Sequence, residues 1–278
     1  MRSSKKLWVT LSLSLLLTGL AFSQAKKVNI DYEAARKAYG NTITISPMDK
    51  GVTVKGNTII LAPEAEGSKY TISGYFNGQI VNKTKKTVIK LDKVFLENTD
   101  GQAAIYSEAK VEISSSRGTT NYVVSSGSSD SKTAALQSKK DMKIGGSGIL
   151  YVVGNVYHAV KADDVKIKGS GELYLQGTSK GSAVNCHNFE VEEEKTFKCY
   201  MLNSKNGVKA DFAIDISSGN FYLYNLETAF KTDTSKEDSS QPHYIKLAGG
   251  VIRTSGVEEL YSTEAKGYKL AGARIVEE

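Results

Sequence analysis

The chain has 278 residues, a formal net charge of +6 and an apolar content of 40%. This composition supports one large folded domain or two small ones and excludes a chain that is disordered throughout. Glycine is frequent (25) and proline is rare (3), which favours many short strands joined by turns.

The N-terminus has the pattern of a secretory signal peptide. Arg2, Lys5 and Lys6 precede the apolar run LWVTLSLSLLLTGLAF, and small residues follow it. We therefore predict that residues 1–23 are a signal peptide and that the protein is secreted, or is periplasmic or at the cell surface. We expect no stable membrane insertion after cleavage. Loss of the three basic residues lowers the net charge from +6 to +3, which does not favour nucleic acid as a partner.

One short helical pattern, DYEAARKAY, follows the leader. It lies within residues 26–66, which we predict to be an N-terminal cap region that covers the open edge of the first coil.

The rest of the chain contains a repeat. A small residue followed by an apolar one opens each of five blocks, and successive steps are 24, 24, 24 and 22 residues; the small residues are Ala135, Ala159, Ala183, Gly207 and Ala229. Each block has two strand-like pieces and cannot bury its own apolar face without a neighbour. We predict an all-β fold: a single-stranded right-handed parallel β-helix (β-solenoid) over residues 67–278, with coils of about 24 residues and a short N-terminal helical cap.

Stacked coils convert positions in the sequence into columns in space. By alternation, one inward column contains Val160, Val184, Val208 and Phe230. Two outward columns contain tyrosines: one has Tyr151, Tyr174, Lys198 and Tyr222, and the other has Val153, Gln176, Tyr200 and Tyr224. Cys186 and Cys199 fall on inward positions, where buried reduced thiols are favoured over a disulfide.

The outward columns supply the candidate carbohydrate-binding residues. These are Tyr151, Tyr174, Tyr200, Tyr222, Tyr224, Lys161, Lys209 and Lys231. Exposed tyrosine rings can stack against sugars, and lysines can pair with the carboxylates of uronic acids. The alternative for the tyrosines is that they stack on one another and stabilise the sheet.

Four aspartates are candidate calcium ligands: Asp163, Asp164, Asp211 and Asp233. Carboxylates one strand spacing apart repel each other unless a cation neutralises them, and Asp211 with Asp233 is the better pair to share an ion. Neighbouring lysines are the alternative source of neutralising charge. No catalytic residues are predicted, because the sequence contains no nucleophile elbow, no zinc-protease motif and no phosphate-binding loop.

Three phrases between Tyr70 and Asp233 resemble a known family. They are YTISGYFNGQIVNKTKKTVIKLDKVFLENTDGQAAIYSEAKVEI, AALQSKKDMKIGGSGILYVVGN and AVKADDVKIKGSGELYL. They are similar to secreted carbohydrate-binding domain-containing proteins with a pectate-lyase-like right-handed parallel β-helix. The resemblance implies binding of calcium and of cellulose-like and acidic plant polysaccharides, without established cleavage. Asp163 and Asp164 match the acidic places of the family's phrase, whereas residues 139–141 and 185–188 depart from it.

These observations predict an exported, non-catalytic protein that binds polysaccharide, with acidic glycans and calcium as candidate ligands. One alternative is a calcium-dependent polysaccharide lyase of pectate type, in which Lys161 or Lys209 would be the base. The other alternative is a surface adhesin or structural β-solenoid.

Overall fold

The computed structural model describes residues 30–192, 196–233, 243–262 and 267–278. The predicted signal peptide lies outside these residues. Among the described residues, no helix has the length and apolar character needed to span a membrane.

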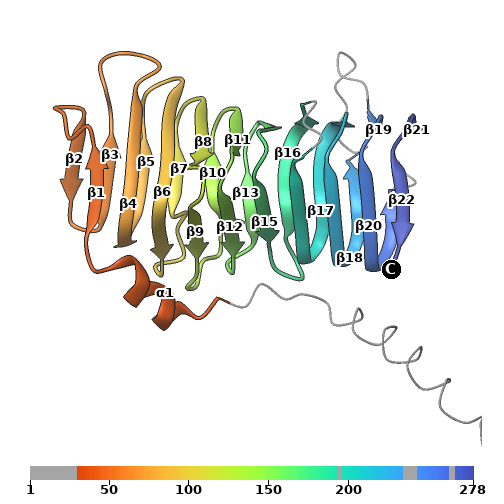
Figure 1. The fold of residues 1–278 in the computed structure, drawn as a ribbon, viewed down its shortest axis with the longest axis horizontal. Helices are drawn as coiled ribbons and strands as arrows, with labels where there is room; N and C mark the ends of the chain where they lie inside the picture. The colour runs from red at the N-terminus through yellow and green to blue at the C-terminus, as the bar shows by residue number, and fades with distance from the viewer. Residues whose placement is uncertain (1–29, 193–195, 234–242, 263–266) are drawn as a thin grey trace, which may run out of the picture.

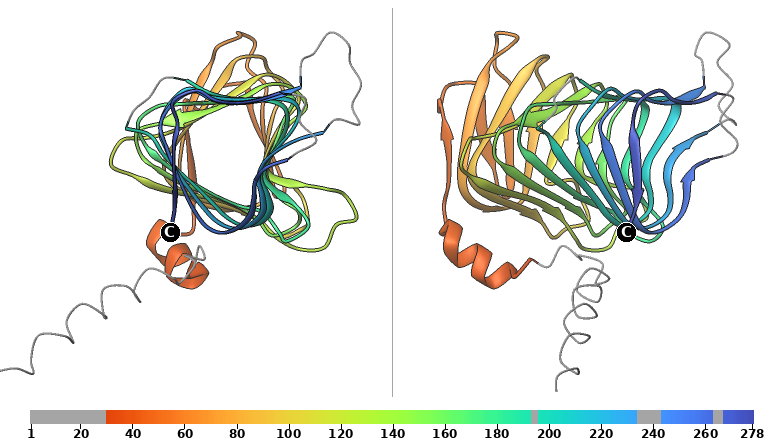
Figure 2. Two further views of the ribbon diagram at one scale, coloured as in Figure 1. Left: turned by 90° about the vertical axis from the view of Figure 1, so that its right-hand side faces the viewer. Right: turned by 45° about the vertical axis from the view of Figure 1, so that its right-hand side comes forward.

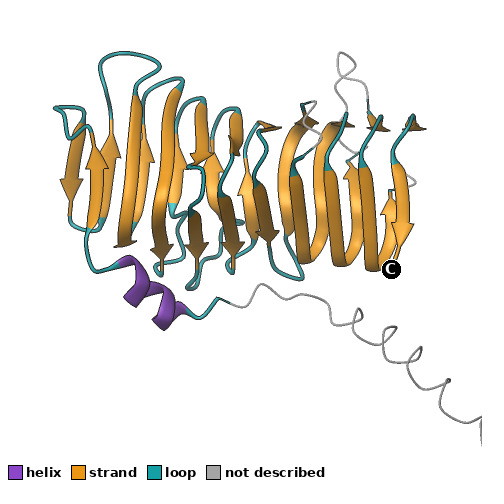
Figure 3. Ribbon diagram, viewed as in Figure 1, coloured by secondary structure: helices purple, strands orange, loops and turns teal. Residues whose placement is uncertain are grey.

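The described chain is one short helix followed by strands (Figures 1 and 3). The N-terminal part contains α1 (Tyr32–Tyr39), β1 (Ile43–Ser46), β2 (Val52–Lys55), β3 (Thr58–Leu61), β4 (Lys69–Asn77), β5 (Gln79–Asn82) and β6 (Thr87–Asn98). The middle part contains β7 (Ile105–Ser107), β8 (Val111–Ser115), β9 (Thr120–Ser125), β10 (Ala134–Ser138), β11 (Met142–Gly146), β12 (Ile149–Gly154), β13 (His158–Lys161), β14 (Asp164–Lys168) and β15 (Glu172–Gln176). The C-terminal part contains β16 (Ser182–Val191), β17 (Lys198–Ile216), β18 (Asn220–Thr232), β19 (Tyr244–Leu247), β20 (Val251–Tyr261), β21 (Tyr268–Leu270) and β22 (Arg274–Glu277).

The strands pair in parallel along three faces that surround one core. The first face runs through β7, β10 and β13 into parts of β16, β17 and β18. The second face runs through β8, β11 and β14 into β16, β17 and β19. The third face runs through β9, β12 and β15 into β17, β18, β20 and β22. Viewed along the row of strands, the ribbon closes on itself (Figure 2).

This architecture corrects the predicted regular right-handed β-helix with a helical cap. All 22 strands belong to one continuous hydrogen-bonded sheet, so the described chain forms a closed, mainly parallel, barrel-like sheet. The long strands β16, β17 and β18 run from one face into the next without a break, and the β1–β4 and β2–β3 pairs are antiparallel. The number of residues between paired positions is also uneven. It is 31 from Ile105 to its partner Leu136 and 22 from Tyr200 to its partner Tyr222. Turns of different length between the strands break the regularity that the repeat suggested.

Helix α1 does not cover the end of the sheet, and this part of the prediction is also wrong. It lies outside the closed sheet (Figure 2), where Tyr32 and Tyr39 pack against Phe95 of the third face. Arg36 anchors the helix, because its guanidinium makes two bonds of 2.8 and 3.0 Å to the carboxylate of Glu97. Asp31 begins the helix by accepting a hydrogen bond from the backbone of Ala34 at 2.9 Å.

Predicted inward positions form the core. Val160, Val184, Val208 and Phe230 pair in register and are fully buried, as the alignment of the blocks predicted. Cys186 and Cys199 are free and buried, and burial raises the pKa of both thiols. Alternation of buried and exposed residues along each strand therefore leaves a second set of side chains on the outside, where the candidate site lies.

We predict that Arg36→Ala releases helix α1 from the third face. The substitution removes two charge-assisted hydrogen bonds and leaves the buried carboxylate of Glu97 with less compensation, so we expect a loss of about 2 kcal/mol of stability. Hydrogen exchange of residues 32–39 should become faster, and the thermal midpoint should fall. Lys37→Ala, at an exposed position of the same helix, is the control. Equal exchange rates in the two variants would contradict the anchor.

Candidate functional site

A groove on the first face contains predicted site residues. It has a volume of about 700 Å³, and its floor is formed by side chains of β10, β13, β16, β17 and β18. Seven lysines line it: Lys132, Lys139, Lys161, Lys180, Lys205, Lys209 and Lys231. Three aspartates also line it, so the formal charge of these groups is +4. We call this feature the lysine groove.

The outward column of the first face forms the centre of the lysine groove. Pairing places Gln137, Lys161, Asn185, Lys209 and Lys231 on successive neighbouring strands. The structure therefore brings the three predicted lysines together in one line. Lys209 and Lys231 are direct neighbours, and like charges directly opposite each other destabilise a sheet unless an anion lies nearby.

The corner that follows this column contains three of the four predicted metal ligands. His187 lies between two of them, with Nε2 at 3.4 Å from Oδ2 of Asp211 and Nδ1 at 4.0 Å from Oδ1 of Asp163. Asp233 forms an ion pair of 2.9 Å with Lys209. These carboxylates thus have cationic or imidazole partners from the protein, as the lysine alternative expected.

The fourth predicted ligand, Asp164, accepts a hydrogen bond of 2.9 Å from the side-chain amide of Asn188. Within the described residues, no group of three or more His, Cys, Asp or Glu side chains has a geometry that could hold a metal ion. The carboxylates present do not converge as a calcium site requires, because calcium takes six to eight oxygen ligands. The residues therefore do not fit calcium, and its binding stays a prediction.

The wall of the groove contains a buried histidine. His158 is only 5% exposed, and its Nδ1 accepts a hydrogen bond of 3.0 Å from the backbone of Ser182. Burial, and next the charge of Lys161, lower the pKa of His158 to about 3. The imidazole is therefore neutral, and it packs edge to face against Tyr157 at 4.6 Å.

The predicted tyrosines lie on the third face and do not line the lysine groove. Five rings stack in one row, which we call the tyrosine ladder: Tyr122, Tyr151, Tyr174, Tyr200 and Tyr222. Neighbouring centroids are 4.3 to 4.9 Å apart, and the rings are inclined by no more than 19°. The guanidinium of Arg253 ends the row at 5.2 Å from the last ring.

This ladder corrects one predicted column. The alignment placed Lys198 between Tyr174 and Tyr222, but Tyr200 occupies that position, because Tyr200 follows its partner Tyr174 by 26 residues and the alignment assumed 24. A shift of two residues keeps every side chain on its predicted side of the sheet and changes only its neighbours. Tyr224 lies outside the ladder and donates a hydrogen bond of 3.3 Å to Glu278.

Stacking has a consequence for sugar binding. Within the ladder, both faces of each inner ring are covered by neighbouring rings, so a sugar cannot stack on them. Only the ring edges and the hydroxyl groups are open to a ligand. Burial raises the pKa of Tyr174, and so do Tyr200 and the hydrogen bond of 3.0 Å that its hydroxyl donates to Glu172. The arrangement is that of aromatic pairs that stabilise a sheet.

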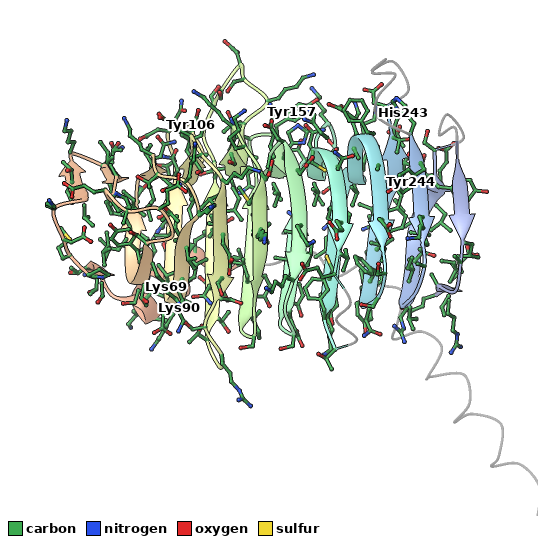
Figure 4. All side chains as sticks on the ribbon, turned by 90° about the horizontal axis from the view of Figure 1, so that it is seen from above. Lys69, Lys90, Tyr106, Tyr157, His243 and Tyr244 are labelled. Carbon is green, nitrogen blue, oxygen red and sulfur yellow. The ribbon has the colours of Figure 1, made fainter. Side chains whose placement is uncertain are left out.

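Several residues of the lysine groove were missed in the sequence. Lys132 and Lys180 lie in the turns before β10 and β16, and Lys205 lies within β17. Tyr157 takes a similar position before β13, where the Nζ of Lys132 lies 5.7 Å from its ring centroid. Figure 4 shows Tyr106 and Tyr157 along the same side of the molecule. Each of these lysines comes two or three residues before a small–apolar pair, a signal that the alignment contained.

A family model and a solved structure match parts of this chain. Residues 55–181, somewhat less than half of the chain, match the family model described as "Carbohydrate-binding domain-containing protein". Among solved structures, the chain is similar to a polysaccharide lyase-like protein from C. thermocellum, solved as a gadolinium derivative. The two are 20% identical, with a TM-score of 0.51, over 83% of this chain and 88% of that one, so this likeness concerns the fold alone. No curated protein matches the chain.

We predict that Tyr174→Ala lowers the free energy of unfolding by about 3 kcal/mol, because it removes two ring contacts and buried apolar area. Tyr174→Phe, which keeps the ring, should lose less than half as much. Urea unfolding measures both. If the alanine variant were as stable as the phenylalanine variant, the ladder would not stabilise the sheet.

We also predict that His158 makes the fold sensitive to acid. An unfolded histidine has a pKa near 6.5, whereas the pKa of His158 in the fold is about 3, so below pH 6.5 only the unfolded chain gains this proton. The contribution of neutral His158 to the free energy of unfolding is complete above pH 6.5 and is lost progressively as the pH falls toward 3. Between pH 6.5 and 5 we expect a loss of about 2 kcal/mol in urea unfolding. His158→Asn keeps an acceptor for Ser182 and does not titrate, so the same loss in this variant would contradict the assignment.

Proposed function

We propose that the protein is an exported, non-catalytic carbohydrate-binding protein that binds acidic polysaccharide along the lysine groove. The observation that carries the proposal is the row of Lys161, Lys209 and Lys231 on neighbouring strands of one face. A linear polyanion presents charges at repeated intervals, and a row of lysines on a rigid sheet presents the opposite charge in the same manner. The family match over residues 55–181 supports a carbohydrate as the ligand.

The charge of the groove supports an acidic glycan over a neutral one. Lysines in the groove outnumber the aspartates by seven to three. Lys209 has Asp233 as a partner, and Lys205 has Glu227 at 3.6 Å, so part of this charge is already neutralised. One uronate carboxylate beside Lys161 and another beside Lys231 would relieve the remaining repulsion. Hydrogen-bonding groups such as Asn185 lie between the charges and suit sugar hydroxyls.

Calcium is a separate proposal that the groove does not require. In the proposed mode, lysines contact the sugar carboxylates directly, and the aspartates orient those lysines. Export likewise rests on the basic and apolar pattern of residues 1–23.

The lyase alternative gains no support from the described geometry. A lyase base must be free to take a proton from the sugar, whereas the side chain of Lys209 is engaged by Asp233 at 2.9 Å. Among the residues that line the groove, no arginine accompanies the lysines. A flat adhesive surface, the other alternative, would not need a concave row of cations.

We predict that purified protein is retarded by polygalacturonate in affinity electrophoresis and much less by a neutral polysaccharide such as hydroxyethyl cellulose. Lys161→Ala/Lys209→Ala/Lys231→Ala should weaken the retardation at least about tenfold, because each lost charge-assisted contact is worth about 1 kcal/mol or more. Added salt should weaken binding of the wild-type protein.

The matched control removes three lysines of equal charge from elsewhere. Lys55, Lys83 and Lys85 are exposed and do not line the groove. Their triple alanine variant should bind as the wild-type protein does. Equal weakening by both triple variants would mean that net charge alone is responsible and would overturn the proposed site.

A further inference from the structure

A second basic hollow lies at the edge of the second face. It has a volume of 430 Å³ and is lined by the turns that follow β8, β11 and β14. Four cationic side chains surround it, and one carboxylate accompanies them: Lys90, Arg117, Lys143, Lys168 and Glu112. We call it the serine–glycine hollow, because serines and glycines form most of its floor.

Small residues in one outward column create the hollow. Lys90, Ser114, Gly145 and Lys168 pair in sequence across neighbouring strands, so the two central positions carry almost no side chain. At Gly145 a β-carbon would lie 2.1 Å from the carbonyl oxygen of Lys168, so no larger residue fits without movement of the backbone. Close packing of the turns therefore keeps the space between the two lysines open.

The cations around this hollow have no ion-pair partner among the described residues, in contrast to the lysines beside them. On the same face, Lys166 pairs with Glu190 at 2.9 Å, and Lys246 pairs with Asp215 at 2.8 Å. No such pair involves Lys90, Arg117, Lys143 or Lys168 in the described part of the chain. The second face thus pairs its charges closely in one region. Around the hollow, Glu192 interacts with Lys143 and Lys168 only at longer range, and four cations against Glu112 and Glu192 leave a net positive charge among the described residues.

A buried hydroxyl provides an independent sign of a missing partner. Ser116 lines the hollow and is 7% exposed, yet its Oγ has no hydrogen-bond partner in the described chain. Buried hydroxyl groups in folded proteins are nearly always hydrogen-bonded. The guanidinium of Arg117, in the next position, can bind a carboxylate with two parallel bonds. Arg117 is exposed and offers a cation to an incoming anion, whereas the hydroxyl of Ser116 lies beneath the surface of the hollow.

We propose that the serine–glycine hollow is a second binding site for the carboxylate of an acidic sugar. Figure 4 places Lys90 on the side of the molecule opposite Tyr106 and Tyr157, which mark the side of the lysine groove. One protein molecule can therefore hold two segments of polyuronate and cross-link them. The nature of the ligand rests on the proposed function, whereas the existence of the second site does not depend on the lysine groove.

Equilibrium dialysis with tetragalacturonate tests the number of sites. The wild-type protein should bind two molecules, and Lys90→Ala/Lys143→Ala/Lys168→Ala should bind one. Arg117→Ala removes an exposed cation that has no ion-pair partner among the described residues, so it should keep its thermal midpoint and weaken one of the two sites by about tenfold. The triple variant of Lys55, Lys83 and Lys85 should keep both sites.

Cross-linking gives a second readout. Wild-type protein mixed with long polygalacturonate should increase light scattering, and variants of either site should bind without this increase. If the hollow variant kept two sites and full scattering, the inference would be wrong. If wild-type protein bound one molecule, lost by the Lys161, Lys209 and Lys231 variant alone, the inference would fail and the proposed function would stand. Loss of that one molecule only in the hollow variant would instead overturn the lysine groove.

Discussion

The parallel register between neighbouring strands is the constraint on which the rest of this structure depends. It places residues from successive blocks side by side at the ~4.8 Å spacing of a sheet, so that each sequence position becomes a row. Rows of valine fill the core, and a row of tyrosines becomes a continuous stack. The same register also places side chains of like charge next to each other on neighbouring strands, where they repel. The protein resolves this on the second face by placing Lys166 and Lys246 on either side of the neighbouring Glu190 and Asp215, and resolves it only in part on the first face.

In the proposed function, the third face stabilises the fold and the first face binds the ligand. In the tyrosine ladder, the rings contact one another. Helix α1 covers the beginning of the third face, where its Tyr32 and Tyr39 contact Phe95. The lysine groove instead keeps cations in a row, beside a histidine that burial holds neutral. A rigid sheet carries these lysines, so little backbone ordering is needed when a ligand binds. Retained positive charge on a fixed surface is what a polyanion recognises.

Much of this arrangement could be predicted from the sequence, and the parts that failed have physical causes. The spacing of the blocks was sufficient to pair Val160 with Val184 and Val208, because alternation and burial fix the register there. It placed Lys198 where Tyr200 lies, because the sequence of the strands does not show the length of the turn between them. The prediction of a regular coil with a helical cap was wrong for two reasons. The long strands continue from one face into the next, and α1 packs through its tyrosines on the outside of the sheet. Lys132 and Lys180 were missed because the alignment began at the small–apolar pairs, and these lysines lie in the turns before them.

A crystal structure of the protein with bound tetragalacturonate tests the central claim most directly. We expect the ligand to lie along the first face, with its carboxylates within hydrogen-bond distance of Lys161, Lys209 and Lys231. A ligand on the third face, with sugars against Tyr174 and its neighbours and the lysine groove empty, would contradict the account.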